Sequence, residues 1–184
     1  PKVVEAILSV VDVPLCIDSN EPTILEAGLR CAPGKPLVNS VNGEEKQLAA
    51  VLPLVRERGA VVIGLTIGED GIPETAEGRL AAAGKIIERA AKLGIPAEDI
   101  IIDPLVMTVG HNSNAATVTL KTIELIRKEY GVNINLGASN FSFGLPGRPS
   151  VNSAFLSLAM QAGATCSITP AISAVTRARA RSRR

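Results

Sequence analysis

The strongest constraint on the fold is a regular alternation of short β-branched apolar runs with longer amphipathic segments. The runs predict six strands, at residues 13–18, 36–40, 60–66, 99–104, 132–137 and 164–169. The amphipathic segments predict helices at residues 1–11, 21–30, 44–58, 76–93, 114–130 and 151–163. Continuous apolar strands that alternate with helices are typical of a parallel sheet covered by helices.

Two α/β architectures fit this alternation, a doubly wound open sheet and a (β/α)₈ barrel. Six strands favour the open sheet by count. The sequence begins with Pro1 inside a helical pattern, however, and its 184 residues fall short of the roughly 250 of a typical barrel. Two further strands upstream would supply much of the difference. Strand count alone therefore leaves both architectures open.

The composition favours a folded chain in the cytoplasm, without a membrane segment. Apolar residues make up 46 % of the sequence, yet no apolar run is long enough to span a bilayer. Residues 1–14 lack the features of a secretory signal. The cysteines, Cys16, Cys31 and Cys166, are far apart and there is one His, so we expect buried free thiols and no protein-bound metal.

The charge is uneven along the chain. The net charge is +1, and five arginines lie in the last eight residues. Such a tail can contact nucleic acid, but no aromatic or further basic cluster accompanies it, so we expect no nucleic-acid partner. The sequence therefore predicts one domain over residues 1–172 and an Arg-rich tail, or a truncated last helix, over residues 173–184.

Polar residues recur where the predicted strands end, and in both architectures that edge binds ligands. They are Asp18, Asn39, Thr66, Asp103 and Asn140. One such residue alone often only caps a helix or bends a loop, but the repetition predicts a ligand site. No phosphate-binding glycine motif is present, and the single His111 lies in a polar loop where we expect it to be solvated.

The residue types at this edge narrow the class of ligand. A carboxylate accepts two parallel hydrogen bonds, and the amino-pyrimidinone edge of a pterin or guanine offers two adjacent N–H donors. Two Asp and two Asn at one edge suit such a flat heterocycle better than a phosphate or a sugar acid. Many other ligands fit a polar edge as well.

Five segments in order carry a resemblance to a known family: "VPLCIDS", "PLVNSVNGE", "IGLTIGEDGIPET", "IIIDPLV" and "LGASNFSFGLPGRPSVNSAFL". They resemble the pterin-binding barrel of the methyltetrahydrofolate:corrinoid methyltransferases. This family includes the acetogen-type enzyme and the folate domain of cobalamin-dependent methionine synthase. The likeness covers nearly all of residues 10–172. It implies a (β/α)₈ TIM barrel of pterin-binding type that is incomplete, with about six β/α units present and the first two strands missing.

The resemblance also implies roles for particular residues. Asp18, Asn39 and Asp103 would hold the pterin ring by its hydrogen-bonding edge, and the catalytic Asn140 would lie near N5, which carries the methyl group. Gly137 and Ser139 would shape the adjacent wall. Arg148 would support the loop or the contact with the partner protein.

The implied activity is a methyl transfer between N5 of methyltetrahydrofolate and cob(I)alamin, in either direction. The cobalamin would be carried by a separate corrinoid protein, the enzyme would hold no metal of its own, and it would be a homodimer. The Gly-Leu-Pro-Gly turn at residues 144–147 suggests a mouth open to a corrin, while we expect Phe141 and Phe143 to cover core.

Two other functions stay open on the sequence. Dihydropteroate synthase uses the same barrel but needs basic residues for a pyrophosphate, whereas the loops after Asp18 and Asn140 lack Lys and Arg148 stands alone. The chain could also be a non-catalytic docking module for a corrinoid protein, or an inactive barrel fragment. An unclosed barrel would leave two unpaired strand edges.

Overall fold

The computed structural model describes residues 1–110 and 114–169. The helices are α1 (Lys2–Leu8), α2 (Pro22–Cys31), α3 (Glu45–Arg58), α4 (Ala76–Lys92), η1 (Ala97–Asp99), α5 (Ala115–Tyr130), η2 (Ala138–Asn140) and α6 (Arg148–Ala162). The strands are β1 (Cys16–Asp18), β2 (Leu37–Asn42), β3 (Val61–Leu65), β4 (Ile100–Asp103) and β5 (Asn133–Ile134). The predictions for His111 and for the tail at residues 173–184 fall outside the described residues.

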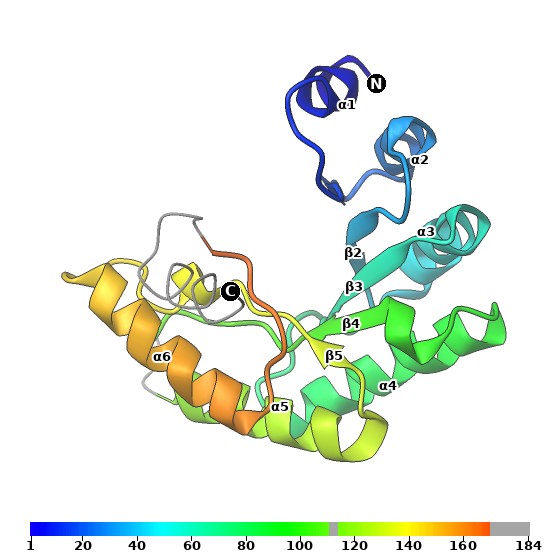
Figure 1. Ribbon diagram of the computed structural model, residues 1–184. Coiled ribbons are helices and arrows are strands. Elements are labelled where there is room, and N and C mark those ends of the chain that lie inside the picture. Colours follow the sequence, from blue (N-terminus) through cyan, green and yellow to red (C-terminus); the bar gives the residue numbers. More distant parts are fainter. Residues whose placement is uncertain (111–113, 170–184) are drawn as a thin grey trace.

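The five strands form one parallel sheet in the order β1-β2-β3-β4-β5. A doubly wound sheet reverses its strand order at a switch point, and this sheet does not. The open-sheet alternative is therefore wrong, and the incomplete barrel is confirmed. Figure 1 shows the strands as an arc, with α3, α4 and α5 along its outer side.

The sixth predicted strand, residues 164–169, lies beside β5 without forming a regular strand. The backbone N–H groups of Thr165 and Cys166 both donate to the carbonyl of Ile134 at 3.0 Å, and Ile168 donates to Leu136 at 2.8 Å. A regular parallel ladder has evenly spaced bonds, whereas two of these converge on one acceptor. The prediction was right about the position of the segment and wrong about its geometry.

The outward face of the sheet forms the hydrophobic core with the helices. Five of the strand residues that point outward are at most 1 % exposed: Val38, Val62, Ile100, Ile102 and Ile134. Burying one such side chain contributes about 1.5–3 kcal/mol. Helix α4 approaches β3 so closely that a Cβ on Gly64 would lie 2.9 Å from Cγ2 of Ile86, so only glycine fits there.

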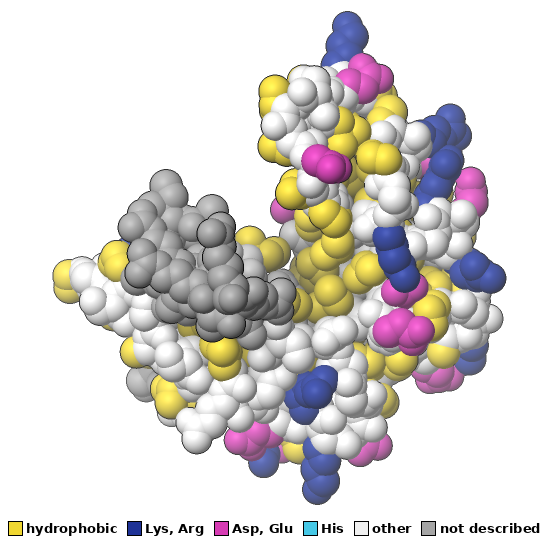
Figure 2. Space-filling view, viewed as in Figure 1, with side chains coloured by type: hydrophobic (Ala, Val, Ile, Leu, Met, Phe, Trp, Pro, Cys, Tyr) yellow, Lys and Arg dark blue, Asp and Glu magenta, His cyan; other side chains and the backbone are white. Residues whose placement is uncertain are grey.

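The inner face of the sheet carries the side chains that alternate with the core residues. The register places Asp18, Asn39 and Ile63 at the same height on neighbouring strands, and Leu65 beside Asp103 one layer further on. Figure 2 shows hydrophobic side chains gathered in the hollow that this face lines. Of the polar strand ends predicted from the sequence, Asp18, Asn39 and Asp103 thus lie on this inner face.

The surroundings of the cysteines differ from the expectation. The cysteines are free thiols, but Cys16 is exposed and Cys31 and Cys166 are half-buried, so the expected burial was wrong. Cys16 points into the open hollow instead of a closed core. Within the described residues, no helix has the length and apolarity that crossing a membrane requires.

Candidate functional site

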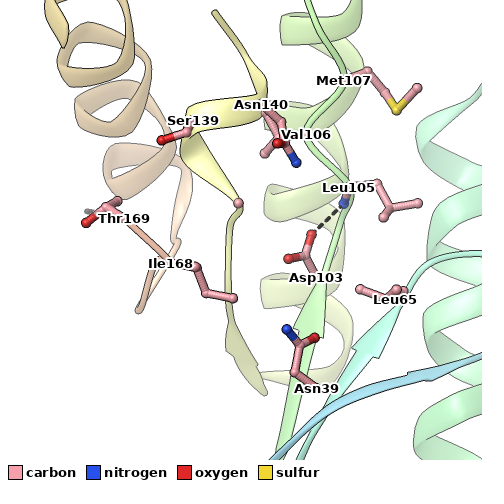
Figure 3. A pocket seen from close by; sticks show the side chains of 11 residues that line it. Asn39, Leu65, Asp103, Leu105, Val106, Met107, Ser139, Asn140, Ile168 and Thr169 are labelled. Carbon is pink, nitrogen blue, oxygen red and sulfur yellow. Dashed lines mark hydrogen bonds between the residues drawn. The ribbon is translucent and has the colours of Figure 1, made fainter. Parts of the chain in front are cut away.

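A cavity of about 660 Å³ lies at the carboxyl edge of the strands, between the ends of β2, β3 and β4 and the segments that follow β4 and β5. Its polar lining consists of Asn39, Asp103, Ser139, Asn140 and Thr169. Its apolar lining consists of Leu65, Leu105, Val106, Met107 and Ile168, and Gly137 completes the wall. Figure 3 shows Asn39, Asp103 and Asn140 on one side of the cavity and Ile168 on the other. The cavity therefore combines a few polar groups with apolar walls, a combination typical of sites for small organic ligands.

Asp103 is the most buried charged group at the site, with 7 % of its surface exposed. The backbone N–H of Leu105 donates to its Oδ1 at 2.9 Å, and the side-chain amide of Asn135 donates to its Oδ2 at 2.9 Å. Burial raises the pKa of Asp103 to about 6, and these two hydrogen bonds oppose the rise. Each carboxylate oxygen keeps a lone pair that can accept a hydrogen bond from a ligand.

Asn39 and Asp18 form a pair on neighbouring strands. The amide nitrogen Nδ2 of Asn39 donates to Oδ2 of Asp18 at 3.1 Å. Asn39 lines the cavity, whereas Asp18 does not. Asp18 therefore lies behind Asn39 and fixes the orientation of its amide, which leaves the Asn39 oxygen as an acceptor for a ligand.

Asn140 ends the short helix η2, whose turn is closed by a hydrogen bond of 3.0 Å from its N–H to the carbonyl of Gly137. A Cβ on Gly137 would lie 3.1 Å from the Asn140 amide nitrogen, which is tighter than most contacts of this kind. Glycine at position 137 thus leaves room for the amide of Asn140 at the cavity wall. Ser139 lines the same wall.

Arg148 supports the loop that carries Asn140. Its Nε donates to Oγ of the buried Ser142 at 3.1 Å, and its Nη2 donates to the carbonyl of Ser139 at 2.9 Å. Its guanidinium also lies 5.6 Å from the centre of the Phe143 ring. Of the two roles left open for Arg148, these contacts are those of loop support, and Arg148 does not line the cavity.

The two phenylalanines of this loop have different surroundings. Phe141 stacks on Phe155 of α6, with ring centroids 4.0 Å apart, and anchors the loop to the core. Phe143 is 68 % exposed, so the expectation that it covers core was wrong. The difference arises because Phe141 precedes the turn toward α6 and Phe143 lies on its outer side, under Arg148.

Sequence reasoning missed Asn135 and the apolar wall after β4. Asn135 lies inside the predicted strand 132–137, and not at a strand end, where the polar residues that predict the site recur. It is 3 % exposed and contacts Asp103 directly. The period of two was the signal that could have found it, because it places Asn135 and Gly137 on the same face of that strand. The wall at Leu105, Val106 and Met107 carries no such signal.

Thr66, also expected at this edge, is fully buried and does not line the cavity. It follows β3 in the outward position, so it faces the helices. Across residues 1–110 and 114–169, no group of three or more His, Cys, Asp or Glu side chains is placed to hold a metal ion.

Comparison with known proteins places this chain in a family. The family model described as "Pterin binding enzyme" matches residues 1–169. A methylcorrinoid:tetrahydrofolate methyltransferase of Eubacterium limosum is 36 % identical over 156 residues, covering 83 % of this chain and 58 % of that protein. A methionine synthase of Mycobacterium tuberculosis is 36 % identical over 163 residues, covering 82 % of this chain and 14 % of that protein.

Solved structures support the same fold. A dihydropteroate synthase from Xanthomonas albilineans, solved with 7,8-dihydropteroate, superposes with a TM-score of 0.74 at 21 % identity. The match covers 96 % of this chain and 68 % of that one. Identity at this level shows the barrel alone. With a family match over nearly its whole described length, the chain belongs to the pterin binding enzymes, and it spans only part of its curated relatives.

Proposed function

We propose that this chain carries the pterin site of a methyltransferase that moves the N5 methyl group between methyltetrahydrofolate and the cobalamin of a corrinoid protein. The observation that carries the proposal is the cavity in which Asp103, Asn39 and Asn140 converge. The names of the two relatives at 36 % identity point to the same chemistry. The chain spans 58 % and 14 % of those relatives, so the activity of a whole protein is part of the proposal.

Asp103 is the anchor for the pterin ring in this proposal. Near neutral pH most of its carboxyl is ionised, since its pKa is about 6. An ionised carboxylate accepts the two adjacent N–H groups of the amino-pyrimidinone edge side by side. The amide oxygen of Asn39 accepts a further donor. Leu65, Leu105 and Val106 supply apolar contact to the flat ring.

The methyl transfer itself needs a change of charge at N5. The electron pair of cob(I)alamin attacks the methyl carbon in line, the bond between N5 and the methyl group breaks, and its electron pair stays on N5. Tetrahydrofolate and methylcobalamin result after N5 gains a proton. A neutral amine leaves poorly, so the transition state needs positive character at N5.

We assign to Asn140 the role of stabilising this positive charge at N5. Its carboxamide can accept a hydrogen bond from protonated N5 and so stabilise the transition state by a fixed dipole, without acting as an acid. Gly137 leaves the amide its place, and Arg148 holds the backbone next to it. The proton comes from solvent in this scheme.

The dihydropteroate synthase alternative fits the cavity less well. That reaction releases pyrophosphate, which calls for Lys or Arg close to the ligand. None of the eleven described residues that line the cavity is basic. The similarity to solved dihydropteroate synthases lies at 17–21 % identity, against 36 % for the methyltransferase relatives.

The test is an activity assay with both substrate pairs. The protein is incubated with methyltetrahydrofolate and free cob(I)alamin, and separately with a dihydropterin pyrophosphate and p-aminobenzoate. The proposal expects the spectrum of methylcobalamin in the first reaction and no dihydropteroate in the second. Product in the second reaction alone would replace the proposal with the alternative, and binding of methyltetrahydrofolate without turnover would favour a docking module or an inactive fragment. The corrinoid partner, homodimer and cytoplasmic location stay predictions.

A further inference from the structure

Arg79 is a buried arginine that lies outside the cavity and that the proposed mechanism does not use. It lies in the first turn and a half of α4 and is 4 % exposed. Burial lowers its pKa. A cation near a helix N-terminus also opposes the helix dipole. Both effects are unfavourable, so the contacts of its guanidinium must account for its presence.

Among the described residues, the hydrogen-bond acceptors of Arg79 are uncharged and come from three segments. Its Nε donates to the carbonyl of Pro73 at 3.0 Å. Its Nη1 donates to the carbonyls of Pro104 and Leu105, both at 2.9 Å, and reaches Oγ1 of Thr119 at 3.5 Å. The guanidinium therefore ties α4 to the segment that directly follows Asp103.

Leu105 is the residue of that segment on which these bonds converge. Its φ of +62° lies in the left-handed region, and it is the single non-glycine residue with a positive φ among those described. Such a backbone conformation is unfavourable for a leucine. Its carbonyl accepts from Arg79 at 2.9 Å and from Thr119 Oγ1 at 3.1 Å, which compensates for that cost.

The peptide between Pro104 and Leu105 links these contacts to the cavity. Its carbonyl accepts from Arg79 at 2.9 Å, and its N–H donates to Oδ1 of Asp103 at 2.9 Å, as the dashed line in Figure 3 shows. The left-handed φ of Leu105 determines where its side chain joins the cavity wall and where its own carbonyl lies relative to this N–H. The contacts thus run from Arg79 through the peptide of Leu105 to the carboxylate of Asp103.

We infer that Arg79 is a positioning residue for ligand binding, which holds the Pro104–Leu105 peptide and the left-handed conformation of Leu105, so that the N–H of this peptide orients the Asp103 carboxylate. The effect on a folate ligand rests on the proposed function, whereas the effect on Leu105 does not. Arg79 touches no atom of a ligand in this scheme.

The matched control is Arg127, another arginine that binds backbone carbonyls. Its Nη1 donates to the carbonyls of Gly131 and Val132, both at 2.7 Å, just before β5. That is the amino end of the strand, opposite the cavity. Arg127→Met therefore removes a comparable set of bonds without touching the proposed site.

The first experiment is a double-mutant cycle read by calorimetry with methyltetrahydrofolate. In the native background, Arg79→Met should raise the dissociation constant about tenfold, the cost of a lost hydrogen bond to a charged group. In a Leu105→Gly background, Arg79→Met should raise the dissociation constant less than about threefold. Glycine adopts a positive φ without cost, so the backbone there needs less support from Arg79. Equal losses in both backgrounds would overturn the inference, and Arg127→Met should leave the affinity unchanged.

The second experiment needs no ligand and keeps the inference testable if folate does not bind. Hydrogen exchange of the Leu105 amide in the free protein should speed up about tenfold in Arg79→Met and stay unchanged in Arg127→Met. Thr119→Val removes one donor to the Leu105 carbonyl and should give a smaller increase in the exchange rate. This variant replaces Arg79→Met in the test if Arg79→Met does not fold. Unchanged exchange in these variants would refute the inference. Absent folate binding by the wild type would refute the proposed function alone.

Discussion

The side-chain amide of Asn135 donates a hydrogen bond of 2.9 Å to Oδ2 of Asp103 on the inner face of the sheet. Asp103 belongs to β4 and Asn135 follows β5, so the contact joins the ends of two neighbouring strands. With the N–H of Leu105 on the other oxygen, it fixes the plane of the carboxylate. The remaining lone pairs are then directed to the cavity.

Replacing Asn135 by Leu should weaken pterin binding in a pH-dependent manner. The change removes a donor that favours the ionised carboxylate, so the pKa of Asp103 rises further above about 6. A hydrogen bond to a charged group contributes about 1.5–3 kcal/mol, which moves the midpoint of binding at least about one pH unit upward. Calorimetry between pH 5 and about 9 measures the shift. Asn133→Ser, two residues earlier and exposed, is the control and should leave the midpoint in place.

Replacing Asp103 by Asn should weaken binding and remove a pH dependence of stability. The pKa of Asp103 is about 6 in the folded protein, against a usual value of 3.8. The folded state therefore holds the proton more tightly, and stability is lost as the pH rises from about 4 through 6. Between about pH 4 and 7 the wild type should therefore lose up to about 3 kcal/mol of stability through this group, at 1.36 kcal/mol for each unit, whereas the variant should not.

Denaturant unfolding of both proteins checks this sign. The unfolding free energy of Asp103→Asn relative to wild type should rise between about pH 4 and 7, whatever its value at pH 4, where the Asn amide faces one of the two N–H donors to position 103. A relative value that stays constant or falls over this range would contradict the assigned burial cost.

Replacing Gly137 by Ala should impair turnover more than binding. The added Cβ would lie 3.1 Å from Nδ2 of Asn140 and push the amide from its place. The φ of −77° suits alanine, so the backbone itself is not strained. Misplacing a catalytic group by a fraction of an ångström to one ångström costs between about tenfold and a hundredfold in kcat.

Steady-state kinetics with methyltetrahydrofolate and cob(I)alamin measure this effect. Gly68→Ala is the matched control, because a Cβ there meets ordinary contacts at 3.8 Å. If both alanine variants lose the same fraction of kcat, the crowding of Asn140 is not the cause.

Replacing Asn140 by Ala should separate catalysis from binding most clearly. The carboxamide is assigned to the transition state, so its loss should reduce methyl transfer by about 3–4 kcal/mol, or a few hundredfold. The dissociation constant for methyltetrahydrofolate should change far less. Equal losses in kcat and affinity would make Asn140 a binding residue only.

The sheet could be predicted from the sequence because buried parallel strands are continuous apolar runs. All five strands lie within or overlap the predicted ranges. β1 is shortened from 13–18 to Cys16–Asp18, because it lies at the edge and pairs with β2 alone in the described sheet. The choice between open sheet and barrel depends on strand order, which a pattern of runs does not contain.

The site could be predicted in part, for a physical reason. Strand ends meet at one edge whatever the loops do, so Asn39, Asp103 and Asn140 could be grouped on one cavity in advance. Asn135 lies within a strand, and Arg79 acts through a peptide 26 residues away in sequence, on Leu105. Contacts of that kind depend on how α4 packs on the sheet, and no local spacing encodes them.

The most direct test of the account is calorimetry of the 184-residue chain with methyltetrahydrofolate, alone and with Asp103→Leu. The account predicts a dissociation constant in the micromolar range for the wild type and a loss of at least about a hundredfold for the variant, since its carboxylate anchors the ring. Unchanged affinity in the variant, or no heat with the wild type, would contradict the claim that this cavity holds a pterin through Asp103.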